Sequence, residues 1–372
     1  GRCTDPSDPE SEGVTTSGGS CLLGGDCALG LTCGTDFTCV PFQPWSGVAC
    51  ASPDPEVPPQ LMFEVPRAPG EGDFFSLPYP NNIRRSGTGL DLSHFPGASN
   101  ETLPSALLAP YAALNEGPTL GYGTNPSVIF RFNTPVDYTS LQFGGNDANF
   151  LFVDITPGSP GYGLAPRSRY YATGAGSPFI CPNWLGIRPS EGSPLAPGRT
   201  YAVLFLDGIR NTGGVALEPS DDFAAMLSET SPSDAALLKA WRSYRVLRTY
   251  LTEQGLSGSV IGGTVFTTGF PQNFLAGVRS AVYSAPAPTI VTNTVCGAGP
   301  PSPCSMEGDR RCAEADPDNE FIEVHAIARL PRYLDGEPPY ADGGGNAHID
   351  YRTGRPYLQG TEDVCLSISI PT

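Results

Sequence analysis

The sequence predicts a mainly β protein that is rich in turns and braced by disulfides. Glycine and proline supply 45 and 40 of the 372 residues, roughly double their ordinary share, and this density is incompatible with a long helical bundle. Hydrophobic residues make up 39% and aromatic residues 10% of the chain, which separates it from intrinsically disordered proteins. Eleven cysteines supply the braces. We expect three parts in order: a disulfide-rich N-terminal module, a β-sandwich and a mixed α+β C-terminal region.

The net charge narrows the range of partners. The chain has 21 basic and 38 acidic residues, which gives −17. Nucleic acids and anionic membrane surfaces attract basic proteins, so both are disfavoured. No apolar run approaches the roughly 20 residues of a membrane-spanning helix, and the strongest run, 201–206, has the length of a strand. No signal segment opens the sequence, so we expect Gly1 to be a processed start. Lipid or envelope anchoring upstream of Gly1 stays open.

The first module, 1–50, is defined by six cysteines, four of which recur at every sixth residue. So short a segment cannot assemble an apolar core, and we expect disulfides, at about 2–4 kcal/mol each, to hold it together. Zinc is not expected here, because there is no CxxC pair and no nearby histidine. Six cysteines allow fifteen pairings, and the spacing selects none of them: Cys3, Cys21, Cys27, Cys33, Cys39 and Cys50.

The role of this module has two interpretations. We favour a rigid spacer, and the alternative is a module for adhesion or protein docking. Disulfides persist in oxidising compartments, so we expect a protein at the surface of a bacterium or outside the cell. The cysteine spacing over 21–39 resembles the short cysteine-rich segments near the N-termini of exported myxobacterial proteins.

A proline-rich stretch, 51–70, has the composition of a semi-rigid linker. The domain that follows, 71–218, begins with aromatic residues and leucines spaced by prolines, which predict an extended segment laid across a domain surface. Short strands separated by Gly/Pro turns then favour a sandwich; we expect them at 128–132, 149–155 and 201–206.

A resemblance sharpens this assignment. The stretch 194–209 together with 213–217 is similar to the closing hairpin of bacterial Ig-like domains, and 128–136 is similar to their opening strand. The resemblance implies an Ig-like β-sandwich and identifies no chemistry.

The C-terminal region, 219–372, contains the clearest helix signal. Ser231 is expected as its N-cap with a proline next to it, and Gly255 as its stop. Arg242, Arg245 and Arg248 form a second line on this helix, and we interpret them as a solvated face. One apolar stripe follows helical spacing: Leu237, Trp241, Tyr244, Leu247 and Leu251.

Five cysteines lie outside the first module. The proline-rich stretch 296–312 predicts a disulfide-stapled loop, and a bridge between Cys181 and Cys365 stays open. An odd total leaves at least one thiol free or joined to another molecule. The five are Cys181, Cys296, Cys304, Cys312 and Cys365.

The order of sandwich, amphipathic helix and a strand ending Phe266-Thr-Thr268 resembles the N-terminal half of secreted bacterial lipases of the virulence-factor type. It also resembles exported myxobacterial α/β-hydrolase proteins. The resemblance implies ester hydrolysis, which in that fold needs a G-x-S-x-G nucleophile elbow. The chain has none, so the catalytic domain of the family is absent from these residues and no catalytic residue is carried over. We interpret the three histidines, His94, His325 and His348, as structural.

Metal motifs are scarce, with neither H-E-x-x-H nor a phosphate loop in the sequence. The acidic run with Asp316, Asp318 and Glu320 offers oxygen ligands to calcium, but its spacing does not match an EF-hand loop. A solvated acidic turn is the default interpretation, and no other cofactor is expected.

The sequence therefore favours an exported interaction or scaffold protein without catalytic activity of its own, which binds a protein partner. One alternative is the accessory N-terminal half of a secreted lipase or esterase, a carboxylic ester hydrolase whose catalytic domain lies beyond Thr372. Another is a structural subunit of an extracellular assembly.

Overall fold

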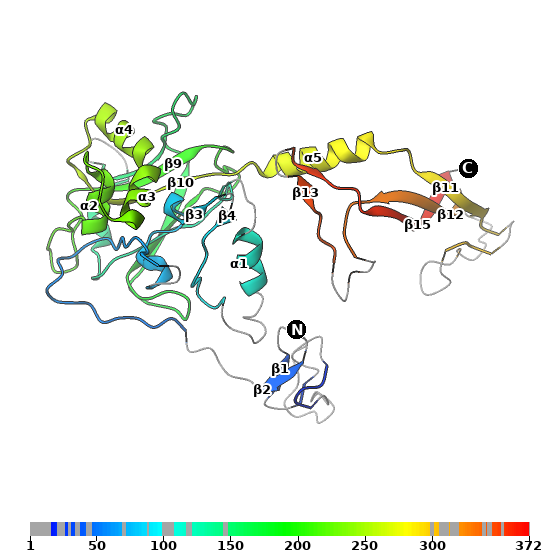
Figure 1. The fold of residues 1–372 in the computed structure, drawn as a ribbon, viewed down its shortest axis with the longest axis horizontal. Coiled ribbons are helices and arrows are strands. Elements are labelled where there is room, and N and C mark those ends of the chain that lie inside the picture. The colour runs from blue at the N-terminus through cyan, green and yellow to red at the C-terminus, as the bar shows by residue number, and fades with distance from the viewer. Residues whose placement is uncertain are drawn as a thin grey trace. The chain divides into compact units, whose positions relative to one another are not determined.

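The structure is a computed structural model, and it divides the chain into two compact units, Gly1–Phe270 (unit 1) and Pro271–Thr372 (unit 2). It is mainly β, and all pairings between its named strands are antiparallel (Figure 1). Within the described part of the chain, no helix is both long and apolar enough to cross a membrane. The structure describes residues 16–20, 27–28, 31–33, 38–41, 47–68, 72–87, 89–98, 108–116, 121–143, 148–297, 301–304, 312, 320–336, 340, 344–350 and 353–371.

The N-terminal module contains a short hairpin, β1 (Leu31–Cys33) and β2 (Cys39–Pro41). A disulfide joins Cys27 to Cys39, and Cys33 is disulfide-bonded as well. These three cysteines are buried and form a small core with Leu31, so disulfides take the place of a large apolar core. Cys3 and Cys21 lie outside the described residues.

Cys50 does not close the N-terminal set, because it forms a disulfide with Cys181, 131 residues away. The backbone of Val48 donates to the carbonyl of Pro178 at 2.9 Å, so the end of the module runs beside the segment that carries Cys181. Gly47 fits this approach, because a Cβ there would lie 3.0 Å from the Pro178 backbone. Spacing along the chain cannot report such a distant neighbour.

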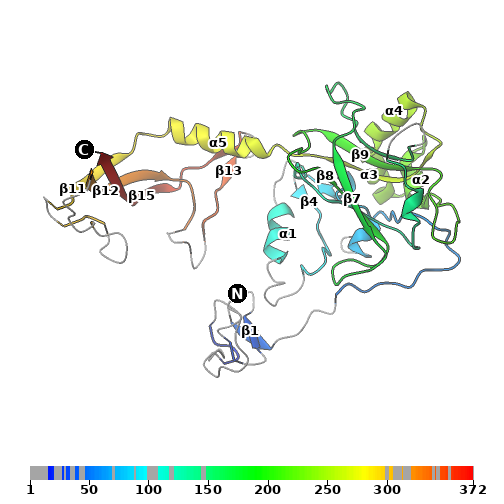
Figure 2. The same ribbon diagram turned by 180° about the vertical axis from the view of Figure 1, so that it is seen from behind.

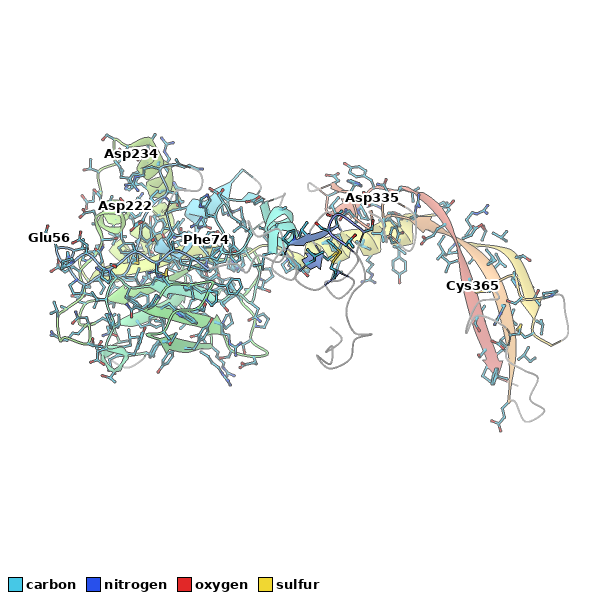
Figure 3. The ribbon with its side chains drawn as sticks, turned by 90° about the horizontal axis from the view of Figure 1, so that it is seen from below. Glu56, Phe74, Asp222, Asp234, Asp335 and Cys365 are labelled. Atoms are coloured by element: carbon cyan, nitrogen blue, oxygen red, sulfur yellow. A yellow bond between two sulfur atoms is a disulfide. The ribbon has the colours of Figure 1, made fainter. Side chains whose placement is uncertain are left out.

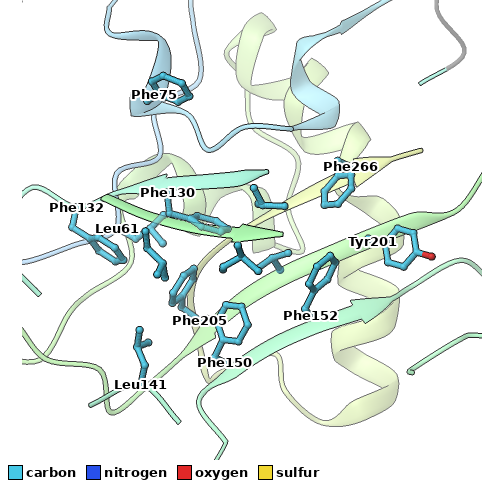
Figure 4. Packing of buried hydrophobic residues seen from close by; sticks show 14 of the residues in the cluster. Leu61, Phe75, Phe130, Phe132, Leu141, Phe150, Phe152, Tyr201, Phe205 and Phe266 are labelled. Carbon is cyan, nitrogen blue, oxygen red and sulfur yellow. The ribbon is translucent and has the colours of Figure 1, made fainter. Parts of the chain in front are cut away.

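Unit 1 is built around two three-stranded sheets, part of which can be followed in Figure 2. One has the order β5-β8-β7 and the other β10-β9-β6. Their facing sides share one apolar cluster, in which Phe205 contacts Phe130, Phe132 and Phe150 at ring-centroid distances of 4.8–5.9 Å (Figure 4). The strands are β5 (Val128–Arg131), β6 (Phe150–Asp154), β7 (Ser168–Thr173), β8 (Trp184–Pro189), β9 (Thr200–Leu206) and β10 (Val260–Thr267).

The central strand β9 is buried on both faces. Its alternating residues Tyr201, Val203 and Phe205 point into the cluster between the sheets. Ala202, Leu204 and Leu206 join a second cluster, formed with helices on the opposite side. These helices are α2 (Asp221–Leu227), α3 (Ala235–Ser243) and α4 (Arg245–Gln254). They and β10 belong to unit 1, so the compact units divide after residue 270 rather than at the expected 218/219 boundary.

The long predicted helix is two helices that meet at Tyr244, whose backbone leaves helical geometry with φ −93° and ψ 3°. Its start is also later than expected: Asp234, not Ser231, caps α3 by accepting the backbone N–H of Leu237 at 2.8 Å. The end is the expected one, with Gly255 at φ 68°. Arg248 packs its guanidinium 3.8 Å from the Trp241 ring centroid, while Arg242 and Arg245 are exposed.

The segment after the linker lies inside unit 1, not across its surface as the sequence predicted. Two 3₁₀ turns, η3 (Phe74–Ser76) and η4 (Asn82–Arg84), follow one another here. The side chain of Asn81 is fully buried and donates to the Tyr244 hydroxyl at 2.9 Å. Extended backbone is found at Leu77 and Asn81, next to these turns, and the aromatic rings of Phe74 and Phe75 are buried. Smaller elements nearby are β3 (Arg85–Ser86), β4 (Gly89–Leu90), α1 (Leu108–Glu116) and η6 (Tyr138–Ser140).

Unit 2 holds one three-stranded sheet in the order β11-β12-β15. Its two long strands pair over twelve residues, from Phe321 opposite Pro371 to Arg332 opposite Gly360. A helix, α5, contacts the turn of a small hairpin, where a Cβ on Gly277 would lie 1.7 Å from the carbonyl oxygen of Gly354. The elements are α5 (Pro271–Ser284), β11 (Thr289–Val295), β12 (Phe321–Arg332), β13 (Ile349–Asp350), β14 (Arg355–Pro356) and β15 (Gly360–Pro371).

Candidate functional site

The two faces of the unit 2 sheet carry different sets of side chains. Side chains alternate between the faces of a strand, so Glu323 and His325 of β12 share one face with Cys365 and Ser367 of β15. Cys365 is labelled in Figure 3. We call this the polar face. The apolar face is defined by Ile290, Val295, Ile322, Ile368 and Ile370, which lie on the opposite side in the observed register.

On the polar face, the His325 ring is held from both nitrogens. It is 2% exposed. Its Nε2 lies 2.8 Å from Glu323 Oε1, which also accepts from the Ser367 hydroxyl at 3.2 Å. Its Nδ1 lies 2.7 Å from Ser302 Oγ. A neutral imidazole that donates its Nε2–H to the carboxylate accepts the Ser302 hydroxyl at Nδ1.

Two disulfides surround this histidine. Cys296 bonds to Cys312 and Cys304 bonds to Cys365, so the stapled loop is tied both to the end of β11 and to β15. Cys312 Sγ lies 3.8 Å from His325 Nδ1. The sulfurs of Cys296 and Cys312 and the nearer His325 nitrogen all lie within 4.8 Å of one another.

The contacts Ser302–His325–Glu323 follow the order of a Ser–His–acid triad, but the neighbourhood of the serine does not suit acyl transfer. An oxyanion hole normally uses the backbone N–H of the residue after the nucleophile. That residue is Pro303, and the preceding one is Pro301, so neither carries an N–H. Ser302 Oγ also accepts the backbone N–H of Cys304 at 3.1 Å. This arrangement fixes the loop and the imidazole in place.

The five residues that define the apolar face are exposed in the described part of unit 2. Ile322, Ile368 and Ile370 are 43–46% exposed, and Ile290 and Val295 are 52% and 42% exposed. On α5, Leu275 and Tyr283 are 67% and 80% exposed. Exposed apolar residues gathered on one face are typical of interaction surfaces.

The remaining predicted site residues lie elsewhere. Asp316 and Asp318 lie outside the described residues, and Glu320 is exposed just before β12. His94 is exposed at a positive φ of 63°. The exposed His348 Nε2 lies 3.0 Å from Asp335 Oδ2, and the pKa of Asp335 is lowered, first by the backbone N–H of Asn346 and then by His348.

The Cys181–Cys365 bridge that the sequence left open does not form, because each of these cysteines has a different partner. Ser302 and Glu323 were missed as members of the His325 cluster. The spacing Glu323-x-His325 in a strand places both on one face and could have revealed that pair. Tertiary structure brings Ser302 beside His325, and no local sequence pattern indicates this contact.

No family model matches the sequence, and no curated protein matches it. Among solved structures, the chain is similar to the S-layer protein rSbsC(31-844), with 10% identity, a TM-score of 0.19, and coverage of 72% of this chain and 34% of that chain. A structure of domains 1-6 of the surface layer protein SbsC matches with 11% identity, a TM-score of 0.18, and coverage of 73% and 36%. The chain thus spans about a third of the length of these two structures.

Proposed function

We propose that the protein is an exported, disulfide-braced interaction or scaffold module that acts at the bacterial surface or outside the cell, without catalytic activity of its own. The observation that carries the proposal is the apolar face of unit 2. A sheet in a folded domain buries its apolar side against a second layer, and the five residues that define this face are each more than 40% exposed.

The contrast with unit 1 supports a docking role for this face. There the apolar residues of β9 fall below 9% exposure on both sides, so the chain is able to build closed cores. In this proposal, unit 1 is an Ig-like sandwich that serves as the rigid base, and unit 2 presents the contact surface to a protein partner.

The state of the cysteines supports export. All nine cysteines in the described residues are disulfide-bonded, and such bonds persist in oxidising compartments. The net charge of −17 disfavours binding to nucleic acid, whose phosphates attract basic proteins, and is compatible with a protein partner.

The test is recovery of the protein from its own cells. A tagged wild-type chain is expected in a surface-associated complex on native gels, and the double variant Ile368→Thr/Ile370→Thr is expected as free chain. Val215→Thr is the matched control, because Val215 is 53% exposed but lies in unit 1. A wild-type chain found only as free monomer would contradict the proposal, as would a complex that survives the double variant. Turnover of short-chain p-nitrophenyl esters by the purified chain would contradict its non-catalytic part.

A second candidate is the accessory half of a secreted lipase or esterase, and the edge position of β15 favours it. In the sheet order β11-β12-β15, the outer side of β15 is an edge, and an uncovered edge is a ready template for a further strand. In this candidate, the covering layer belongs to a hydrolase domain encoded beyond Thr372. An open reading frame with a G-x-S-x-G motif after Thr372 would support it, and an immediate stop codon would end it.

A further inference from the structure

We propose that Cys296, Cys312 and His325 form a thiol-gated zinc site. The site is closed while the two cysteines are joined, and it binds one Zn²⁺ through their two thiolates and His325 Nδ1 once a thiol reductant has opened the disulfide. The proposal is independent of the docking role of the apolar face.

The donor set is the first support. Two thiolates and an imidazole are ligands that zinc prefers, at about 2.3 Å for sulfur and about 2.0–2.1 Å for nitrogen. In a tetrahedral site these bonds place the ligand atoms about 3.5–4 Å apart. The three atoms already lie within 4.8 Å of one another, and Cys312 Sγ is 3.8 Å from Nδ1. Once the Cys296–Cys312 bond is broken, the two sulfurs need only separate to the spacing of zinc ligands.

The orientation of the histidine is the second support. Histidines that bind zinc generally donate their other ring N–H to a carboxylate or carbonyl, which fixes the tautomer and aims the free nitrogen at the metal. Glu323 Oε1 occupies that position, 2.8 Å from His325 Nε2. In the tautomer that donates its Nε2–H to Glu323, Nδ1 carries the lone pair on the side where Cys312 lies. The Ser302 hydroxyl now contacts Nδ1 at 2.7 Å, and zinc would displace that hydrogen bond.

The second disulfide is the third support, because it keeps the loop in place after the first one opens. Cys304–Cys365 ties the same loop to β15. Cys304 is 4% exposed, whereas Cys296 and Cys312 are both half-buried, so the 296–312 bond is the more accessible one. With that tether intact, Cys312 is eight residues from the anchored Cys304, and Cys296 stays beside β12 through its backbone hydrogen bond to Glu323.

The reaction balances without further components. Two thiol molecules of the reductant are oxidised to one disulfide, and the Cys296–Cys312 bond is reduced to two thiols. Binding of Zn²⁺ then releases the two thiol protons, because only thiolates coordinate the metal.

The experiment uses the full chain, treated with a thiol reductant at the lowest concentration that opens the Cys296–Cys312 bond, desalted without oxygen and exposed to Zn²⁺ alone, with bound metal measured by mass spectrometry. Because reduction also exposes other cysteines, the reference is the double variant Cys296→Ser/Cys312→Ser. We expect the reduced wild-type chain to hold one more zinc per chain than this variant, and the oxidised chain to hold none. Equal zinc in the two reduced proteins would overturn the site, and equal zinc in oxidised and reduced wild-type chains would overturn the gating.

Two further variants test the histidine and its carboxylate. His325→Ala is expected to lose the additional zinc, and Glu323→Gln to weaken its binding by about 10–100-fold, the usual effect of removing such a partner. His348→Ala is the control, because His348 is an exposed histidine that also contacts a carboxylate. Co²⁺ titration supplies a separate readout, since thiolate coordination produces a charge-transfer absorption. Unchanged affinity in both the His325 and Glu323 variants would overturn the assignment even if one of them folded poorly.

Discussion

β9 in unit 1 is apolar on both sides, β15 in unit 2 carries isoleucines on one side, and the two strands lie in opposite environments. Each face of β9 meets a layer, a second sheet on one side and helices on the other. β15 meets the stapled loop on its polar face through Cys365, while Ile368 and Ile370 on the other face stay exposed. The sequence of a strand therefore determines which of its sides is apolar. The layer that buries that side comes from another part of the fold or from a partner.

The largest expected effect comes from the core of unit 1. Phe205 is fully buried and contacts three other phenylalanine rings, so Phe205→Ala should lower the free energy of unfolding by about 3–5 kcal/mol. The matched truncation in unit 2, Ile370→Ala, removes a side chain that is 46% exposed and should cost within about 0.5 kcal/mol. Urea denaturation measures both. Equal losses would show that the two strands are equally covered in solution.

A smaller effect is expected from the long-range disulfide of unit 1. The double variant Cys50→Ser/Cys181→Ser should lower the free energy of unfolding of unit 1 by about 2–4 kcal/mol, because it frees a loop of 131 residues in the unfolded chain. Thermal unfolding measures the change. Cys296→Ser/Cys312→Ser serves as the control in unit 2, and it should leave the transition of unit 1 where it is. A shift of that transition by the control would mean that the units unfold together.

Next comes the contact that holds α5 to its hairpin. Gly277→Ala places a Cβ against the carbonyl of Gly354, and overpacking of this kind costs about 1–3 kcal/mol. We expect faster amide exchange in α5 and β14 and unchanged exchange in unit 1. Gly258→Ala is the control, since a Cβ there meets no atom within 4 Å. Unchanged exchange in α5 would contradict the close contact.

The smallest effect concerns pH. A hydrogen bond with Glu253 raises the pKa of Tyr162 to about 12, against about 10 in an unfolded chain. The folded state therefore favours the protonated phenol, and this contribution is complete below pH 10 and lost as the pH rises to about 12. Tyr162→Phe should flatten the decline of stability over that window, and Glu253→Gln should do the same. Parallel pH profiles for all three proteins would contradict the pairing.

Local signals predicted the local structure well. Short apolar runs between Gly/Pro turns located β5, β6 and β9, and the apolar stripe located α3 and α4. The break at Tyr244 was hidden, because the stripe runs unchanged through it, while the buried hydroxyl contacts Asn81 from a distant segment. The cap was misplaced because Ser231 and Asp234 are both good N-cap residues and only the tertiary course of the chain chooses between them.

The candidate site was harder to predict because disulfide pairing assembles it. The loop at 296–312 was recognisable from its prolines and cysteines, and Cys296–Cys312 closes it. The partners of Cys50, Cys181, Cys304 and Cys365 depend on which segments run side by side in the folded chain. The local sequence pattern does not report which distant segments become neighbours. The contact between Ser302 and His325 therefore could not be predicted from the sequence.

The disulfide between Cys50 and Cys181 also has a mechanical consequence. A pull applied to the chain before Cys50 crosses directly to Cys181 through the sulfur bridge and bypasses everything between them. At about 3.3–3.6 Å per extended residue, the 131-residue separation corresponds to roughly 430–470 Å of contour length that cannot be released under load. Stretched from its N-terminus, the oxidised protein would lengthen by that much less than the reduced one, with β5 and β6 shielded from the force.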